Sequence, residues 1–138
     1  MRILVCDDNV DSADTLRALF ASDGHEVFCF HDSRTCLEKA LEWRPDLVFL
    51  DIGMPQMTGY AVARHIRARY GSHIHIVAVT AYGSQEDKTV AFEAGFDVHL
   101  VKPVSPEKLL AIAADPASQR SSGMRTRSTT TKSPPGAS

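Results

Sequence analysis

Short apolar runs recur along the chain, and each has the length of a β-strand. They are rich in Val, Ile, Leu and Phe, residue types that favour extended structure. The runs cover residues 3–6, 27–30, 47–50, 74–79 and 98–101. We therefore predict five strands.

The segments between these runs carry apolar residues at helical spacing, for example Ala13, Leu16 and Phe20 after the first run and Val62 and Ile66 after the third. Parallel strands need crossover connections, and helices on both faces of a sheet require strands that are apolar throughout. The alternation predicts an α/β fold in which a doubly wound, five-stranded parallel sheet lies between two layers of helices.

Helix ends and starts are marked by residues suited to those positions. Glycine adopts the left-handed turn that often ends a helix, and a Ser whose hydroxyl accepts a backbone hydrogen bond often begins one. A Pro in the first helical position supports the same interpretation. The predicted ends are Gly24 and Gly95, and the predicted starts are Ser84 with Asp87, as a capping box, and Ser105 with Pro106.

The last helical pattern breaks at Asp115-Pro116, and the composition changes to Ser, Thr, Arg, Pro and Gly. Residues 1–114 hold 11 basic and 16 acidic residues, whereas 115–138 hold four basic and one acidic. Such a segment lacks the apolar surface that offsets the entropy of ordering. We predict one domain over 1–114 and a disordered tail over 115–138. Four basic residues without aromatic neighbours do not favour nucleic-acid binding.

Length and composition exclude several classes of protein. The chain of 138 residues suits a single domain. It has neither an apolar run of about 18 residues that would span a membrane nor the pattern of a signal peptide, so we expect a cytoplasmic protein. Cys6, Cys29 and Cys36 are odd in number and lack Cys-x-x-Cys spacing. We therefore expect reduced thiols, without a disulfide or a zinc site.

Polar residues follow four of the five runs. They are Asp7, Asp8, Asp51, Thr80 and Lys102. The carboxyl ends of parallel strands meet at one edge of the sheet, where ligands bind in open α/β folds. Carboxylates gathered there repel one another unless a cation neutralises them, and Mg²⁺ prefers oxygen ligands. A metal, an ammonium group and a hydroxyl donor also suit the charge of a phosphoryl group in transfer.

These residues lie in segments that resemble the receiver domains of two-component response regulators. The segments are 5–9 (VCDDN), 50–59 (LDIGMPQMTG), 79–81 (VTA) and 101–103 (VKP). The resemblance covers about residues 1–114. It implies a flavodoxin-like three-layer sandwich with strand order 2-1-3-4-5.

The resemblance also implies the role of each residue around the metal. Asp51 is expected to be the phosphoacceptor. Asp8 and Asp51 are expected to bind Mg²⁺ directly, and Asp7 through a water molecule. The backbone carbonyl of Gly53 is expected to complete the protein ligands.

Further roles fall on residues around this site. Lys102 and Thr80 are expected to bind phosphate oxygens, and Pro103 to follow a cis peptide that directs the lysine. His99 stands where the family usually has Tyr or Phe as a rotating switch. It is either a replacement for that switch or an ordinary half-exposed strand residue. Gly59 is expected to be structural, permitting the following helix to start.

The expected function is therefore that of a phosphoacceptor, which receives a phosphoryl group from a histidine kinase or a histidine phosphotransfer protein and signals by conformational change. It would catalyse only its own phosphorylation and dephosphorylation. Two alternatives remain open: a magnesium-dependent phosphatase with an aspartyl nucleophile, which would want an Asp where Gly53 stands, and an interaction module that is never phosphorylated. The resemblance fits a stand-alone receiver or the receiver of a hybrid histidine kinase, and the sequence names no downstream target.

Overall fold

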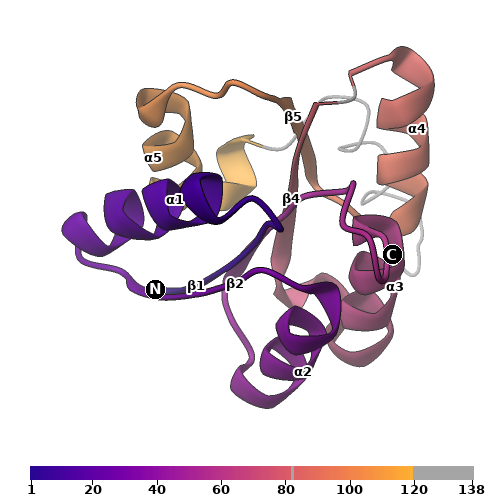
Figure 1. Ribbon diagram of the computed structural model, residues 1–138, viewed down its shortest axis with the longest axis horizontal. Coiled ribbons are helices and arrows are strands. Elements are labelled where there is room, and N and C mark those ends of the chain that lie inside the picture. Colours follow the sequence, from indigo (N-terminus) through magenta and orange to yellow (C-terminus); the bar gives the residue numbers. More distant parts are fainter. Residues whose placement is uncertain (82, 120–138) are drawn as a thin grey trace.

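Strands and helices alternate from one end of the domain to the other in the computed structural model, which describes residues 1–81 and 83–119 (Figure 1). The strands are β1 Arg2–Cys6, β2 Glu26–Phe30, β3 Leu47–Leu50, β4 His75–Thr80 and β5 Val98–Val101. The helices are α1 Val10–Ser22, α2 Ser33–Trp43, α3 Gly59–Tyr70, α4 Gln85–Ala94 and α5 Pro106–Ala114, with 3-10 turns at Gly71–His73 and Pro116–Gln119. All five strands match the predicted runs to within one residue at either end.

The sheet is parallel throughout and has the order β2-β1-β3-β4-β5. The predicted strand order is therefore confirmed. Every strand points the same way, so the residues that follow β1, β3, β4 and β5 all emerge at one edge of the sheet.

The core has two halves, one on each face of the sheet. Leu4 and Cys6 of β1 pack with α2, α3 and α4, whereas Ile3 and Val5 pack with α1 and α5 (Figure 1). Side chains alternate between the faces of a strand, so a strand covered on both sides needs apolar residues at every position. This explains why the runs in the sequence are continuous rather than alternating.

The helix ends agree with the predicted turn and cap residues. Gly24 and Gly95 have φ angles of 91° and 112°, values that side chains other than glycine rarely adopt. Ser84 and Asp87 form a reciprocal capping box at the start of α4. The Ser105 hydroxyl accepts a hydrogen bond from the Lys108 N–H at the start of α5.

The predicted tail begins too early. Pro116–Gln119 form a 3-10 turn that contacts α5, so regular structure continues past residue 115. A proline can start a new turn although it cannot continue the preceding helix. The rest of the predicted tail, 120–138, lies outside the described residues.

The expectation of three reduced thiols is wrong for this structure. Cys6 at the end of β1 and Cys36 in α2 form a disulfide with a Cα–Cα distance of 5.9 Å, and Cys29 is the free cysteine. The two partners lie 30 residues apart in the chain. They meet because β1 and α2 share one half of the core, which spacing along the sequence does not reveal.

A buried ion pair that the sequence analysis missed joins α3 to the start of β5. The Arg67 guanidinium pairs with Asp97, and their side chains are only 16% and 5% exposed. Asp97 also accepts a hydrogen bond of 3.0 Å from the Ile76 N–H, and Arg67 Nε donates one of 2.8 Å to the Gly95 carbonyl. The pair therefore fixes three elements at the edge of the sheet away from the acidic residues.

No helix in the described part of the chain is long and apolar enough to cross a membrane.

Candidate functional site

The polar residues predicted to meet at one sheet edge are brought there by the ends of four strands. Asp7 follows β1, Asp51 follows β3 and Lys102 follows β5, while Thr80 is the last residue of β4. Backbone hydrogen bonds hold the segments together: the Asp51 N–H donates to the Cys6 carbonyl at 2.9 Å, and the Lys102 N–H donates to the Thr80 carbonyl at 2.8 Å. The positions of these side chains are thus set by the sheet itself.

Lys102 and two carboxylates form the centre of the site. Lys102 Nζ lies 3.0 Å from Asp7 Oδ2 and 3.6 Å from Asp51 Oδ2. Asp7 is only 2% exposed, and its Oδ1 accepts a hydrogen bond of 2.9 Å from the Asn9 N–H. A buried carboxylate is stable only with such partners. The ammonium group therefore neutralises part of the negative charge at the sheet edge.

The Asp51 carboxylate lies in a setting that disfavours its ionised form. Burial raises its pKa above the ordinary 3.8, and the negative charge of Asp7 raises it further. The Gly53 N–H, which donates to Asp51 Oδ1 at 3.1 Å, and the Lys102 charge act in the opposite direction without cancelling the rise. A cation bound to this carboxylate, or a covalent bond formed by it, would therefore remove the unfavourable burial and repulsion of its negative charge.

Lys102 shows the complementary effect. Partial burial alone would lower its pKa, but the hydrogen bond and charge of Asp7, together with the charge of Asp51, raise the pKa above its ordinary 10.5. The lysine is therefore fully protonated at neutral pH. A permanent cation at this point attracts anionic ligands.

Three carboxylates could hold a metal ion. One oxygen each of Asp7, Asp8 and Asp51 lies within 4.8 Å of the others, and Asp8 is exposed to solvent. The set contains oxygen donors only, which suits a hard divalent cation such as Mg²⁺ and not a thiolate-seeking metal. The residues present therefore fit the predicted ion. Gly53 is exposed beside them.

Thr80 and His99 lie on the neighbouring strands β4 and β5, where Val101 and not His99 is the partner of Thr80. Thr80 is fully buried, and His99 is 8% exposed and pairs with Ala78 across β4 and β5. The interpretation of His99 as a half-exposed strand residue is therefore wrong. The second interpretation, that His99 replaces the aromatic switch of the family, is compatible with this burial but is not tested by it.

Gly59 has a role that the sequence analysis understated. A Cβ at this position would lie 2.7 Å from the Asp51 carbonyl oxygen and 2.8 Å from the Ile52 Cα, closer than such atoms approach in real proteins. The start of α3 thus packs directly against the backbone that carries Asp51. Thr58 caps the helix, its hydroxyl accepting a hydrogen bond from the Ala61 N–H. The Lys102-Pro103 peptide is cis, as the resemblance implied.

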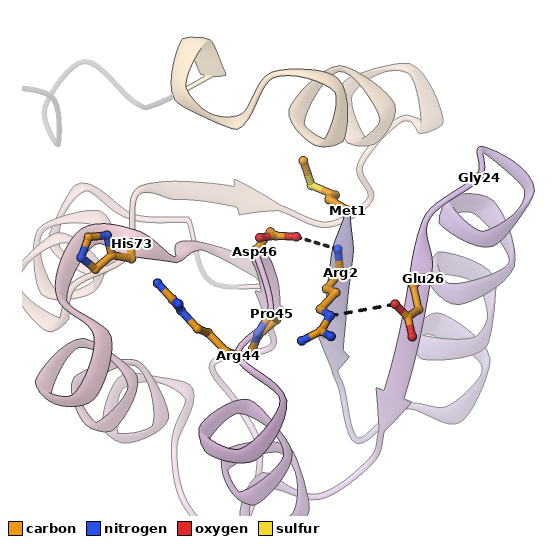
Figure 2. Close-up of a pocket in the computed structure, with 8 residues that line it drawn as sticks. All are labelled: Met1, Arg2, Gly24, Glu26, Arg44, Pro45, Asp46 and His73. Atoms are coloured by element: carbon orange, nitrogen blue, oxygen red, sulfur yellow. Dashed lines mark hydrogen bonds and ion pairs between the residues drawn. The ribbon is translucent and has the colours of Figure 1, made fainter.

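Two pockets flank the sheet at opposite ends. One of about 570 Å³ lies at the start of β1 and β2, where Arg2 contacts Asp46 and Glu26 (Figure 2). It shares no residue with the acidic cluster. A second, of about 380 Å³, opens beside Asp7 and Lys102. Only the second pocket adjoins the residues that the sequence singled out.

Comparison with known proteins agrees with the strand order and the acidic edge. The family model described as the response regulator receiver domain matches residues 3–114. The chain belongs to the response regulator receiver family. The predicted family and fold are thereby confirmed, and the receiver is a domain of two-component signalling.

Solved structures of receivers have the same fold. A CheY-like receiver domain protein from Methanospirillum hungatei JF-1 is 28% identical, with a TM-score of 0.78 over 86% of this chain and 94% of that one. The chemotaxis protein CheY4 of Vibrio cholerae is 30% identical, with a TM-score of 0.76 over 82% of this chain and 95% of that one. The BeF₃-activated DrrB receiver domain is 27% identical, with a TM-score of 0.76 over 82% and 93%.

Proposed function

We propose that this receiver accepts a phosphoryl group on Asp51 from the phosphohistidine of a histidine kinase or a histidine phosphotransfer protein. The observation that carries the proposal is the Asp51 carboxylate, held 3.6 Å from a protonated lysine and beside two further carboxylates at the sheet edge. An Asp51 oxygen would attack phosphorus while the bond to the imidazole nitrogen breaks. The products are an aspartyl phosphate and a neutral or protonated histidine on the donor.

Mg²⁺ would be held directly by Asp8 and Asp51, through water by Asp7, and by the Gly53 carbonyl. When bound, it would neutralise charge on the phosphate oxygens. The support is the chemistry of the donor set: three carboxylates within 4.8 Å and no sulfur or nitrogen ligand among them. The raised pKa of Asp51 also supports a bound cation. The ionised carboxylate is disfavoured at present, and a second positive charge beside Lys102 would favour it.

Lys102 and Thr80 would position the phosphoryl group. The Lys102 ammonium lies 3.0 Å from Asp7 Oδ2 and 3.6 Å from Asp51 Oδ2, so it is close to where a phosphoryl group on Asp51 would be. Thr80 would supply its hydroxyl from the end of β4. Pro103, which follows a cis peptide, would direct the lysine.

The signal would be a change of shape rather than a released product. If Thr80 moves toward the phosphate, it vacates space near the buried ring of His99, which would then move inward. A ligand shifts two states only by its difference in affinity for them, which is typically about 1–3 kcal/mol for this kind of coupling. NMR of the His99 ring with and without beryllofluoride tests the idea. An unchanged chemical shift and pKa on binding would contradict it.

The alternatives have less support. A phosphatase of the aspartyl-nucleophile type would want a carboxyl group at residue 53, and this chain offers only the Gly53 backbone there. A silent module would lack one of the site residues, and none is missing. The cytoplasmic location, the disorder of the tail, and the choice between a stand-alone receiver and part of a hybrid kinase stay predictions.

Labelling with a small phosphodonor tests the proposed function. Wild-type protein incubated with acetyl phosphate and Mg²⁺ should gain one phosphoryl group by intact mass, and Asp51→Asn should gain none. Asp46→Asn is the matched control, because Asp46 directly precedes β3 and so lies at the opposite end of that strand from Asp51. Equal labelling of Asp51→Asn and wild type would refute the assignment, and steady release of phosphate from a phosphate ester would favour the phosphatase.

A further inference from the structure

We propose that this chain has a second metal site, separate from the acidic cluster, in which Asp14, Cys29 and His31 bind a divalent transition metal of the zinc class. Asp14 lies in α1, Cys29 in β2, and His31 directly after β2. One donor atom from each side chain lies within 4.8 Å of the other two. A carboxylate, a thiolate and an imidazole form a mixed donor set that selects zinc-class ions over Mg²⁺.

The spacing of the donors suits such an ion. Cys29 Sγ lies 3.8 Å from Asp14 Oδ1. Zinc bonds of about 2.3 Å to sulfur and about 2.1 Å to oxygen at a tetrahedral angle would place those two atoms roughly 3.6 Å apart. Cys29 is the free cysteine and is half-buried, so its thiol is available as a ligand. The site therefore needs little rearrangement between these two groups.

His31 is held in the way that ligating histidines usually are. Its Nδ1 lies 3.3 Å from the Asp7 carbonyl oxygen. A carbonyl oxygen can only accept, so this contact favours the tautomer with the proton on Nδ1 and leaves the Nε2 lone pair for a metal. Metal-binding histidines commonly donate their other ring N–H to a backbone carbonyl, which fixes the ring. The partner in this contact, the Asp7 carbonyl, lies outside the three-residue cluster, and the contact is consistent with the ligand role of His31.

Competing interactions at the cluster are weak. Arg17 Nε lies 4.0 Å from Asp14 Oδ1, but both side chains are about half exposed, and such pairs contribute little. Burial and the charge of Asp14 raise the pKa of the Cys29 thiol, and a metal ion bound there has to displace that proton. Three protein ligands leave a fourth position for water or an outside ligand, as in zinc sites that are not purely structural.

The expectation of no zinc site rested on spacing along the chain, which does not reveal contacts made by folding. No Cys-x-x-Cys pair exists, but adjacent packing of α1 and β2 brings together residues that are 15 positions apart. The proposed site shares no side chain with the acidic cluster of Asp7, Asp8 and Asp51. The two can therefore be tested separately.

Protection of Cys29 from alkylation tests the proposal on the full chain. With excess Mg²⁺ present, added Zn²⁺ should slow modification of Cys29 by iodoacetamide, measured by peptide mass spectrometry. His31→Gln and Asp14→Ala should each raise the Zn²⁺ concentration needed for protection by about tenfold or more, since loss even of outer-shell partners costs 10- to 100-fold. His65→Gln, which changes an exposed histidine on α3, should leave protection unchanged.

A second readout uses Co²⁺ in place of Zn²⁺. A thiolate ligand gives Co²⁺ a charge-transfer absorption band, which should appear with wild-type protein and be absent in Cys29→Ser. Asp14, Cys29 and His31 are exposed or half-buried, so their variants should fold, and circular dichroism checks that they do. The proposal is overturned if Zn²⁺ does not protect Cys29, if protection persists unchanged in both His31→Gln and Asp14→Ala, or if the Co²⁺ band persists in Cys29→Ser.

Discussion

Replacing Gly59 by Ala should disturb both the stability of the receiver and its phosphoacceptor site, without removing any side chain from that site. The added Cβ would lie 2.7 Å from the Asp51 carbonyl oxygen, whereas ordinary contacts begin near 3.4 Å. The start of α3 and the backbone after β3 must therefore separate by about 0.7 Å, the difference between those two distances. Both of the nearest groups are backbone, so no flexible side chain can absorb the movement.

The expected cost follows from two opposing effects. Forced overpacking costs about 1–3 kcal/mol. Removing a glycine makes the unfolded chain less flexible and returns about 0.4–1 kcal/mol. The net destabilisation should be about 1–2 kcal/mol, which lowers the melting temperature by roughly 4–10 °C. Displacing a reacting group by about 1 Å can slow a reaction about a hundredfold, so phosphorylation should slow on the order of tenfold.

Urea unfolding and phosphorylation by acetyl phosphate measure these two effects on the same protein. Arg64→Ala is the control, because it changes an exposed position on the same helix and should stay within about 0.5 kcal/mol of wild type. If Gly59→Ala matches wild type in both stability and labelling rate, the close contact between α3 and the Asp51 backbone does not constrain the site.

Three further predictions concern the charged residues Arg67, Asp51 and Asp8. Arg67→Ala should destabilise the protein by about 3–5 kcal/mol, because it leaves Asp97 buried without its partner; a loss below 1 kcal/mol in urea unfolding would argue against this. In metal-free protein, Asp51→Asn should raise the melting temperature at pH 7, because folding raises the pKa of Asp51 and so disfavours its ionised form. That gain should shrink as the pH falls through the raised pKa, and a gain independent of pH would contradict the reasoning. Asp8→Ala should abolish Mg²⁺ binding in calorimetry yet keep the protein folded, and an unchanged titration would remove Asp8 from the site.

The sequence predicted most of the fold because hydrophobic period and strand length are local properties. Continuous apolar runs such as Leu47–Leu50 suit strands covered on both faces, and their alternation with helical segments implied the parallel sheet. The site followed from the fold, because Asp7, Asp51 and Lys102 were predicted to meet from their positions after strands. Their contacts, 3.0 Å and 3.6 Å from the lysine nitrogen, agree with that reasoning.

Features that depend on tertiary packing were not predictable in this way. Cys6 and Cys36 are paired by the meeting of β1 with α2, and Arg67 reaches Asp97 across 30 residues. The burial of His99 depends on what covers β5, which the four residues of the strand do not encode. The tight contact at Gly59 depends on how closely α3 approaches β3, a distance that no local pattern contains.

The most direct test of the central claim is to locate the phosphoryl group on the chain. Borohydride reduces an aspartyl phosphate to homoserine, so protein treated with acetyl phosphate and Mg²⁺, reduced and digested, carries a lasting mark at the modified residue. We predict homoserine at residue 51 and at no other aspartate, and only when Mg²⁺ is present during phosphorylation. Homoserine at Asp7 or Asp8, or an unmodified residue 51 in protein that has gained a phosphoryl group, would contradict the account.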